Sequence, residues 1–224
     1  MKKVMVVLII CLSYMFIYIP VSPVEFEQTL SRKVIVLDPG HGGLDNGASF
    51  QNVNEDTLNL KIAFALKEEL ESKGASVYMT RTDDQDMTRR DYMYSKDDDM
   101  YLRARNIDGY KPDMFISIHL NSAHASAWGS QVFYYPKSEK GKILANHIHK
   151  SMKEVTGTKK GIIASDFFIL RSTSSLGVLI ECGFLSNANE RGQLKNRKYH
   201  KKLAKAITEG IENYFSSMVL KNDE

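Results

Sequence analysis

Two histidines and two glutamates in this chain have the residue types and the spacing of a hydrolytic metal site. His41 lies in a glycine-rich loop after an apolar run, and Glu55 begins a helical pattern shortly after that loop. His119 and Glu181 each lie at the carboxyl end of another apolar run. Catalytic zinc is held by three such nitrogen and oxygen ligands, which leaves a fourth position for water. The set therefore predicts a zinc site in which the remaining carboxylate moves protons.

Each of the four residues also has an ordinary structural explanation. His41 can belong to a turn, Glu55 can favour the dipole of its helix from the first turn, and His119 can be a hydrogen-bonded core histidine. Glu181 is harder to explain in this way, because a carboxylate within the run Val-Leu-Ile-Glu-Cys is costly to bury without a partner. The shared location of the four residues carries more weight than any one of them.

Alternating strand and helix patterns give these residues a common frame. Compact apolar runs predict strands at residues 33–38, 77–80, 114–118, 131–135, 167–170 and 178–181. Helical spacing predicts helices between Asn54 and Gly74 and at residues 138–155 and 197–218, and it makes residues 102–108 part of another helix. We therefore expect a single α/β domain with a mostly parallel, twisted sheet flanked by helices. Ligands bind beyond the carboxyl ends of parallel strands, so the four side chains can converge there.

The amino terminus has the pattern of an export signal. Lys2 and Lys3 precede a mostly apolar stretch at residues 4–19, which Pro20 closes. The stretch is long for a signal-peptide core but shorter than the roughly 20 residues of a membrane span, so a cleaved signal and an uncleaved anchor both stay open. Either places the domain outside the cytoplasmic membrane. We expect a signal or membrane-contacting anchor at residues 1–20, a linker at 21–32, the catalytic domain at 33–218 and a polar tail at 219–224.

Several other function classes fit the sequence poorly. The formal net charge of +3 includes Lys2 and Lys3, so the rest of the chain is too weakly basic to predict a nucleic-acid partner. The loop at residues 40–43 lacks the lysine pattern of a P-loop and the full dinucleotide-binding spacing. Cys182 has no histidine recognisably placed to activate it as a nucleophile. The charged stretch at residues 81–108 is either a solvated loop or a rim that contacts substrate or a partner.

Four segments, taken in order, resemble the zinc-dependent N-acetylmuramoyl-L-alanine amidases of the Amidase_3 type. They are Leu-Asp-Pro-Gly-His-Gly-Gly at residues 37–43, Glu-Asp-Thr-Leu-Asn-Leu at 55–60, Ile-Ser-Ile-His-Leu-Asn at 116–121 and Ile-Glu-Cys-Gly-Phe-Leu-Ser-Asn at 180–187. The resemblance implies that His41, Glu55 and His119 bind zinc and that Glu181 is the catalytic glutamate. Asp56 stands where the family usually has lysine, a departure that affects the flank of the site and no ligand.

The resemblance also implies a substrate, the amide bond between N-acetylmuramic acid and L-alanine in peptidoglycan glycan strands that carry stem peptides. The short exported form and the insertion at residues 87–99 resemble the germination-specific amidases of spore formers, the CwlD type. Such enzymes remove stem peptides from spore cortex before muramic-δ-lactam forms, which implies a place at the outer face of the cytoplasmic membrane or in the intermembrane space of the forespore. Some members have a lipoprotein partner, and the sequence does not reveal whether this chain needs one.

Two other functions stay open at the level of sequence. One is a non-catalytic wall-binding protein with a structural metal, and the other is a zinc hydrolase of another exported amide. Asp38 and Asn121 are further candidates, as residues that support the metal ligands through hydrogen bonds.

Overall fold

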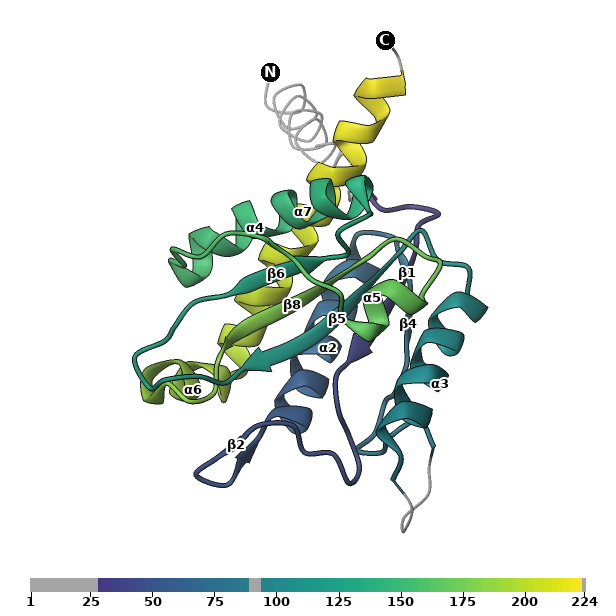
Figure 1. Cartoon of the computed structure of the whole chain (residues 1–224). Coiled ribbons are helices and arrows are strands. Elements are labelled where there is room, and N and C mark those ends of the chain that lie inside the picture. Colours follow the sequence, from purple (N-terminus) through teal and green to yellow (C-terminus); the bar gives the residue numbers. More distant parts are fainter. Residues whose placement is uncertain (1–27, 89–93, 223–224) are drawn as a thin grey trace, which may run out of the picture.

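A six-stranded sheet forms the centre of the computed structural model, which describes residues 28–88 and 94–222 (Figure 1). Across the sheet the order is β4 (Ser76–Met79), β1 (Val34–Pro39), β5 (Met114–Asn121), β8 (Gly177–Phe184), β6 (Gln131–Tyr134) and β7 (Ile163–Ala164). The first four strands are parallel, whereas β6 runs antiparallel to β8 and parallel to β7. The predicted α/β fold with a mostly parallel sheet is confirmed.

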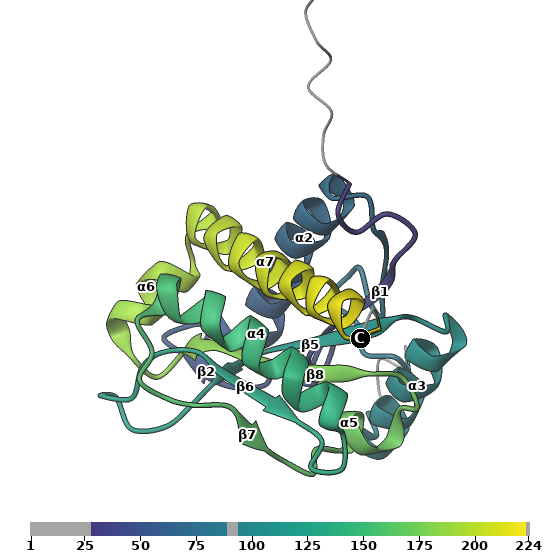
Figure 2. The same ribbon diagram turned by 90° about the horizontal axis from the view of Figure 1, so that it is seen from above.

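Helices cover both faces of this sheet (Figure 2). On one face lie α2 (Glu55–Ser72), α4 (Glu139–Thr156) and α7 (Arg197–Asn222), and on the other lie α3 (Lys96–Gly109) and α5 (Phe168–Ser172). The short helix α6 (Ala188–Leu194) follows β8, and the hairpin of β2 (Ser49–Phe50) and β3 (Val53–Asn54) precedes α2. The helices cover the faces of the sheet, and loops lie at the carboxyl ends of its parallel strands.

Alternation along the strands decides which side chains face which layer. In β5, Phe115 packs in the small core under α3 and α5, whereas Ile116 packs in the large core under α2, α4 and α7. Successive side chains of a strand point to opposite faces, so His119 lies on the same face as Phe115. In β8, Leu179 belongs to the small core, and Glu181 therefore shares the face of His119.

Three predicted elements differ from the structure. Residues 167–170 were expected to form a strand, and this prediction is wrong, because α5 covers Phe168–Ser172 and packs on the sheet instead of joining it. A short apolar run has no period that separates a strand from a buried helix. Helix α3 contains the predicted residues 102–108 and extends beyond them to Lys96, where the Ser95 side chain caps it by accepting a hydrogen bond from Asp98 N at 3.2 Å. Helix α7 continues past residue 218 to Asn222.

The predicted signal or anchor at residues 1–20 lies outside the described residues. Within residues 28–88 and 94–222, no helix is both long and apolar enough to cross a bilayer. Leu30, in the predicted linker, is fully buried, and its amide donates to Lys73 O at 2.9 Å. Leu30 therefore packs against the domain, while the predicted boundaries stay predictions.

Candidate metal centre

Neighbouring strands place His119 and Glu181 side by side. The two residues are register partners in the parallel pair of β5 and β8, close to the carboxyl ends of both strands. The regular pairing shifts between His119 and Asn121, directly after this point. The half-buried carboxylate of Glu181 and the imidazole of His119 thus face the same side of the sheet beside the loop that follows β1.

The three predicted metal ligands come together at this point. His119 Nδ1 lies 3.1 Å from Glu55 Oε1, and His41 Nε2 lies 3.3 Å from the same oxygen. One potential ligand atom from each of the three residues lies within 4.8 Å of those from the other two. Two imidazoles and one carboxylate are a donor set that suits zinc with one position left open. The geometry therefore fits a bound metal ion, and the ligand roles stay a prediction.

Glu55 is held rigidly at the start of α2. Its side chain is almost fully buried, and it accepts hydrogen bonds from Ala48 N at 2.9 Å and from Leu120 N at 3.0 Å. Burial alone would raise its pKa, but hydrogen bonds with His119 and His41 hold the pKa of this carboxyl well below its usual range. Glu55 is therefore deprotonated, as a carboxylate that binds a metal must be.

His41 adopts a backbone conformation that is unusual for a residue with a side chain, with a φ of 63°. Its Nδ1 lies 2.8 Å from Asp45 Oδ2. Burial lowers the pKa of His41, but the hydrogen bonds to Asp45 and Glu55 outweigh it and raise this pKa to about 9. The raised pKa means that the surroundings of His41 favour a bound proton, and a metal ion would take the place of this proton.

Glu181 has a buried oxygen with no hydrogen-bond partner. Its Oε2 is inaccessible to solvent and lacks a partner among the described residues. Burial raises the pKa of Glu181 to about 7, while His119 and His41 act in the opposite direction and Glu55 raises it further. An unpaired carboxylate oxygen beside three convergent donors is what a site prepared for a cation and a water would contain.

These side chains open into a cavity of about 460 Å³ at the carboxyl ends of the strands. One wall is apolar and comes from α5, α3 and β8, through Phe167, Phe168, Ile169, Met100 and Leu179. The cavity is also lined by the polar residues His41, His119, Asp45 and Glu181. A concave site with a few convergent polar groups is typical of an enzyme active site.

Two buried arginines hold the loop that carries His41. Arg103 donates to Pro39 O at 2.8 Å and to the carbonyl of His41, and Arg81 donates to Gly40 O at 3.0 Å. Three consecutive carbonyls are thereby bound by guanidinium groups. Two carboxylates balance the charge of Arg103: Asp38 Oδ1 lies 2.9 Å from its Nη1, and Asp99 Oδ2 lies 2.8 Å from its Nε. These contacts fix the unusual backbone of the loop.

The two expected supporting residues have other roles. The carboxylate of Asp38 accepts hydrogen bonds from Thr80, Ser117 and Arg103, so its hydrogen-bond connection to His41 runs through the arginine. The side chain of Asn121 bonds to Gln131 Oε1 at 3.4 Å and to the amide of the next residue. Two other side chains contact the predicted ligands directly, and the sequence did not indicate either of them: Asp45 lies 2.8 Å from His41 Nδ1, and Asn59 donates to Glu55 Oε1 at 3.3 Å. Asp45 is the partner of His41. Its place four residues after His41 in a glycine-rich loop was the available signal.

Comparison with known proteins agrees with this geometry. The profile of Amidase_3, the N-acetylmuramoyl-L-alanine amidase family, matches residues 35–213. The chain is 36% identical over 193 residues to the germination-specific N-acetylmuramoyl-L-alanine amidase of Bacillus subtilis, a match that covers 84% of this chain and 81% of that protein. It is 38% identical over 194 residues to a probable cell wall amidase, LytH, of Staphylococcus saprophyticus, covering 84% of this chain and 60% of the relative.

Solved structures show the same fold. The CwlD amidase of Clostridioides difficile, solved in complex with the GerS lipoprotein, superposes with a TM-score of 0.78 at 34% identity and covers 83% of this chain and 99% of that one. The catalytic domain of CwlV, an N-acetylmuramoyl-L-alanine amidase from Bacillus (Paenibacillus) polymyxa var. colistinus, gives a TM-score of 0.71 at 32% identity, with 82% and 98% coverage. The sheet and its helices are thus those of a group of amidases.

Proposed function

The chain belongs to the N-acetylmuramoyl-L-alanine amidase family, and on this premise we propose that it cleaves the amide between N-acetylmuramic acid and L-alanine in spore-cortex peptidoglycan with zinc as its metal. The amidase activity itself follows from the family. The observation that supports the metal-dependent chemistry is the convergence of His41, Glu55 and His119 within 4.8 Å, with the buried carboxylate of Glu181 beside them.

The four residues divide the chemistry between them. His41, Glu55 and His119 would hold the ion, since each offers a ligand atom to the same point. When bound, zinc polarises the scissile carbonyl and lowers the pKa of water towards about 7. Glu181 accepts a proton from the attacking water and returns it to the departing alanine nitrogen, a contribution of typically about 10²–10⁴-fold to the rate.

The environment of Glu181 suits a residue that must both take up and release a proton. Burial raises its pKa to about 7, and a group with a pKa near neutrality exchanges protons efficiently in both directions. A nearby cation would favour the charged carboxylate and lower this pKa, so Glu181 starts the reaction as a base. The apolar wall of Phe168, Ile169 and Leu179 lines the same cavity and keeps its dielectric low.

Place and partners follow from the same proposal. The apolar stretch at residues 4–19 after two lysines supports export to the outer face of the cytoplasmic membrane or into the intermembrane space of the forespore. The similarity to a germination-specific relative supports the spore cortex as the substrate's setting. The CwlD structure contains the GerS lipoprotein, which supports a lipoprotein partner for this chain as well.

Mass spectrometry of purified cortex fragments tests the proposal against its two rivals. The protein is incubated with the fragments after chelation and again after zinc is restored. Free stem peptides that begin with L-alanine, formed only with zinc, are the expected product. Unchanged glycopeptides would support a wall-binding protein, and cleavage of a different amide would support another hydrolase. Vegetative peptidoglycan, assayed in parallel, tests the preference for cortex.

A further inference from the structure

The carboxylate of Asp45 lies between His41 and a tyrosine from a distant part of the chain. Asp45 Oδ2 is 2.8 Å from His41 Nδ1 and accepts a hydrogen bond from the Tyr94 hydroxyl at 3.0 Å. Its other oxygen accepts from Gly47 N at 3.0 Å. Both carboxylate oxygens are therefore bonded, and one oxygen links the predicted ligand to Tyr94.

The direction of these hydrogen bonds decides which nitrogen of His41 faces the metal. Asp45 Oδ1 faces the amide of Gly47, and Oδ2 faces the hydroxyl of Tyr94, so the carboxylate is surrounded by hydrogen-bond donors. A carboxylate in such surroundings accepts hydrogen bonds, so Nδ1 of His41 is the donor in its contact with Asp45. Nε2, which lies 3.3 Å from Glu55 Oε1, is then the nitrogen that faces the metal position. A histidine ligand that donates its other ring proton to a carboxylate is better oriented and more basic.

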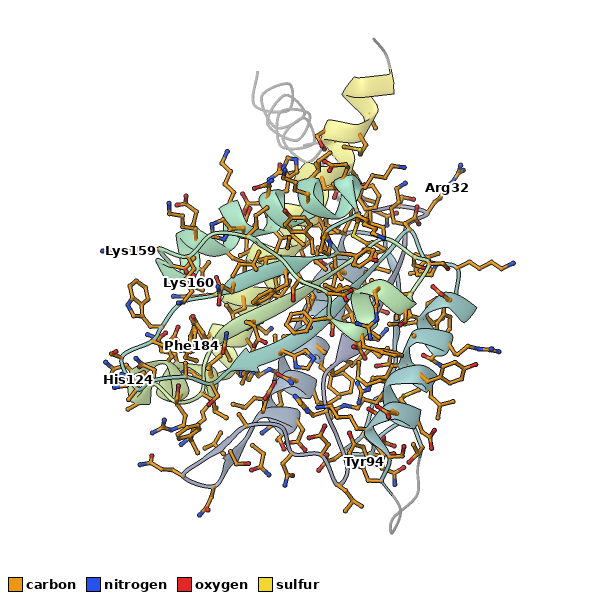
Figure 3. The ribbon with its side chains drawn as sticks, viewed as in Figure 1. Arg32, Tyr94, His124, Lys159, Lys160 and Phe184 are labelled. Carbon is orange, nitrogen blue, oxygen red and sulfur yellow. The ribbon has the colours of Figure 1, made fainter. Side chains whose placement is uncertain are left out.

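Tyr94 comes from the charged stretch at residues 81–108, whose role the sequence left open. It is partly buried and directly precedes Ser95, the cap of α3, so it lies at the start of that helix (Figure 3). The helix in turn is fixed to the loop of His41, because Arg103 pairs with Asp99 within α3 and donates to the carbonyl of His41. The hydroxyl of Tyr94 is thus presented to Asp45 by a firmly attached element.

We propose that Tyr94 and Asp45 are positioning residues of the metal centre, which form a hydrogen-bond chain that holds the ring of His41 in its ligating orientation. The inference rests on the proposed function to the extent that this site binds a metal. The stretch at residues 81–108 then contributes to the metal centre through Tyr94. The linkage predicts that loss of a hydroxyl group outside the ligand set weakens metal binding.

Zinc affinity of the purified protein, measured by competition with a chromophoric chelator, tests the chain of hydrogen bonds without substrate. We expect Asp45→Asn to lower the affinity by about 10- to 100-fold, as loss of an outer partner of a histidine ligand does. Tyr94→Phe removes one hydrogen bond and should lower it by about threefold. In the double variant the effect of Tyr94→Phe should disappear, because its partner is already altered.

Tyr101→Phe is the matched control. Tyr101 lies on α3, is 54% exposed, and its hydroxyl bonds only to Arg105 among its described contacts, at 3.2 Å. This variant should keep the parent's zinc affinity, and metal-free Tyr94→Phe should unfold at the same temperature as the parent. That combination separates positioning from a general loss of stability.

Three results would overturn the inference. The first is a zinc affinity equal to the parent's in both Asp45→Asn and Tyr94→Phe. The second is a loss of zinc affinity from Tyr94→Phe that is just as large in the Asp45→Asn background, and the third is a parent protein that binds no zinc. The two proposals can also fail separately. If the variants show the expected order of zinc affinities but the protein leaves cortex glycopeptides intact, the proposed function is refuted and this inference stands.

Discussion

Gly40 is the position where the smallest change should do most harm to the metal centre. A Cβ added there would lie 2.1 Å from Cε1 and 2.2 Å from Nε2 of His119. That is roughly 1.3 Å short of the 3.4 Å at which ordinary contact begins. Gly40 itself cannot retreat easily, because its amide donates to Ile118 O at 3.0 Å and its carbonyl accepts from Arg81 at 3.0 Å. The imidazole must therefore move.

The size of this movement sets the expected loss. Metal–ligand distances hold to within about 0.2 Å, so a ring displaced by roughly 1.3 Å no longer binds the ion. Loss of a residue that only hydrogen-bonds to a metal ligand lowers metal affinity by about 10- to 100-fold. Loss of the ligand His119 itself in Gly40→Ala should therefore lower zinc affinity by at least about 100-fold. Overpacking should destabilise the metal-free fold by only about 1–3 kcal/mol.

Chelator competition with zinc and thermal unfolding of the metal-free protein measure the two effects separately. Gly192→Ala is the matched control, because nothing lies within 4 Å of a Cβ built at Gly192. It should keep the parent's zinc affinity. If Gly40→Ala folds and binds zinc as tightly as the parent, His119 does not hold the ion in the way described.

Three further predictions follow from the same site. Glu181→Gln should keep its zinc by elemental analysis and lose about 10²–10⁴-fold in amide hydrolysis; near-parent turnover would contradict the role of a proton carrier. The pKa of His41 is raised to about 9, so below that pH the imidazole must lose a proton before it binds the ion. Zinc affinity should therefore rise about tenfold per pH unit from about pH 7 to 9, and an affinity that does not change with pH would contradict this. Arg103→Met leaves buried Asp38 unpaired and should cost about 3–5 kcal/mol by chemical denaturation; a loss below about 1 kcal/mol would show that the pair is dispensable.

The sequence predicts the sheet and two of the four central residues for the same physical reason. Strands buried on both faces appear as compact apolar runs, and a polar residue at the end of such a run is conspicuous. His119 and Glu181 stand out in this way at the ends of β5 and β8, where the structure makes them register partners. Their roles as ligand and base stay predictions that the variants above test.

The parts that were missed depend on tertiary contacts. Arg103 lies 62 residues from His41 in the chain, and no local pattern indicates that its guanidinium binds that carbonyl. Tyr94 lies in a charged stretch that has no periodicity, and its partner Asp45 is 49 residues away. The antiparallel direction of β6 and the helix at Phe168–Ser172 likewise depend on packing against the sheet.

Anomalous diffraction at the zinc edge, from crystals of the zinc-loaded protein, would show which residues bind the ion. We expect one peak at about 2.0–2.2 Å from single atoms of His41, Glu55 and His119, with the carboxylate of Glu181 nearby but not bound to the ion. A peak elsewhere, or an ion bound directly by Glu181 in place of one of the three, would contradict the division of roles on which the account depends.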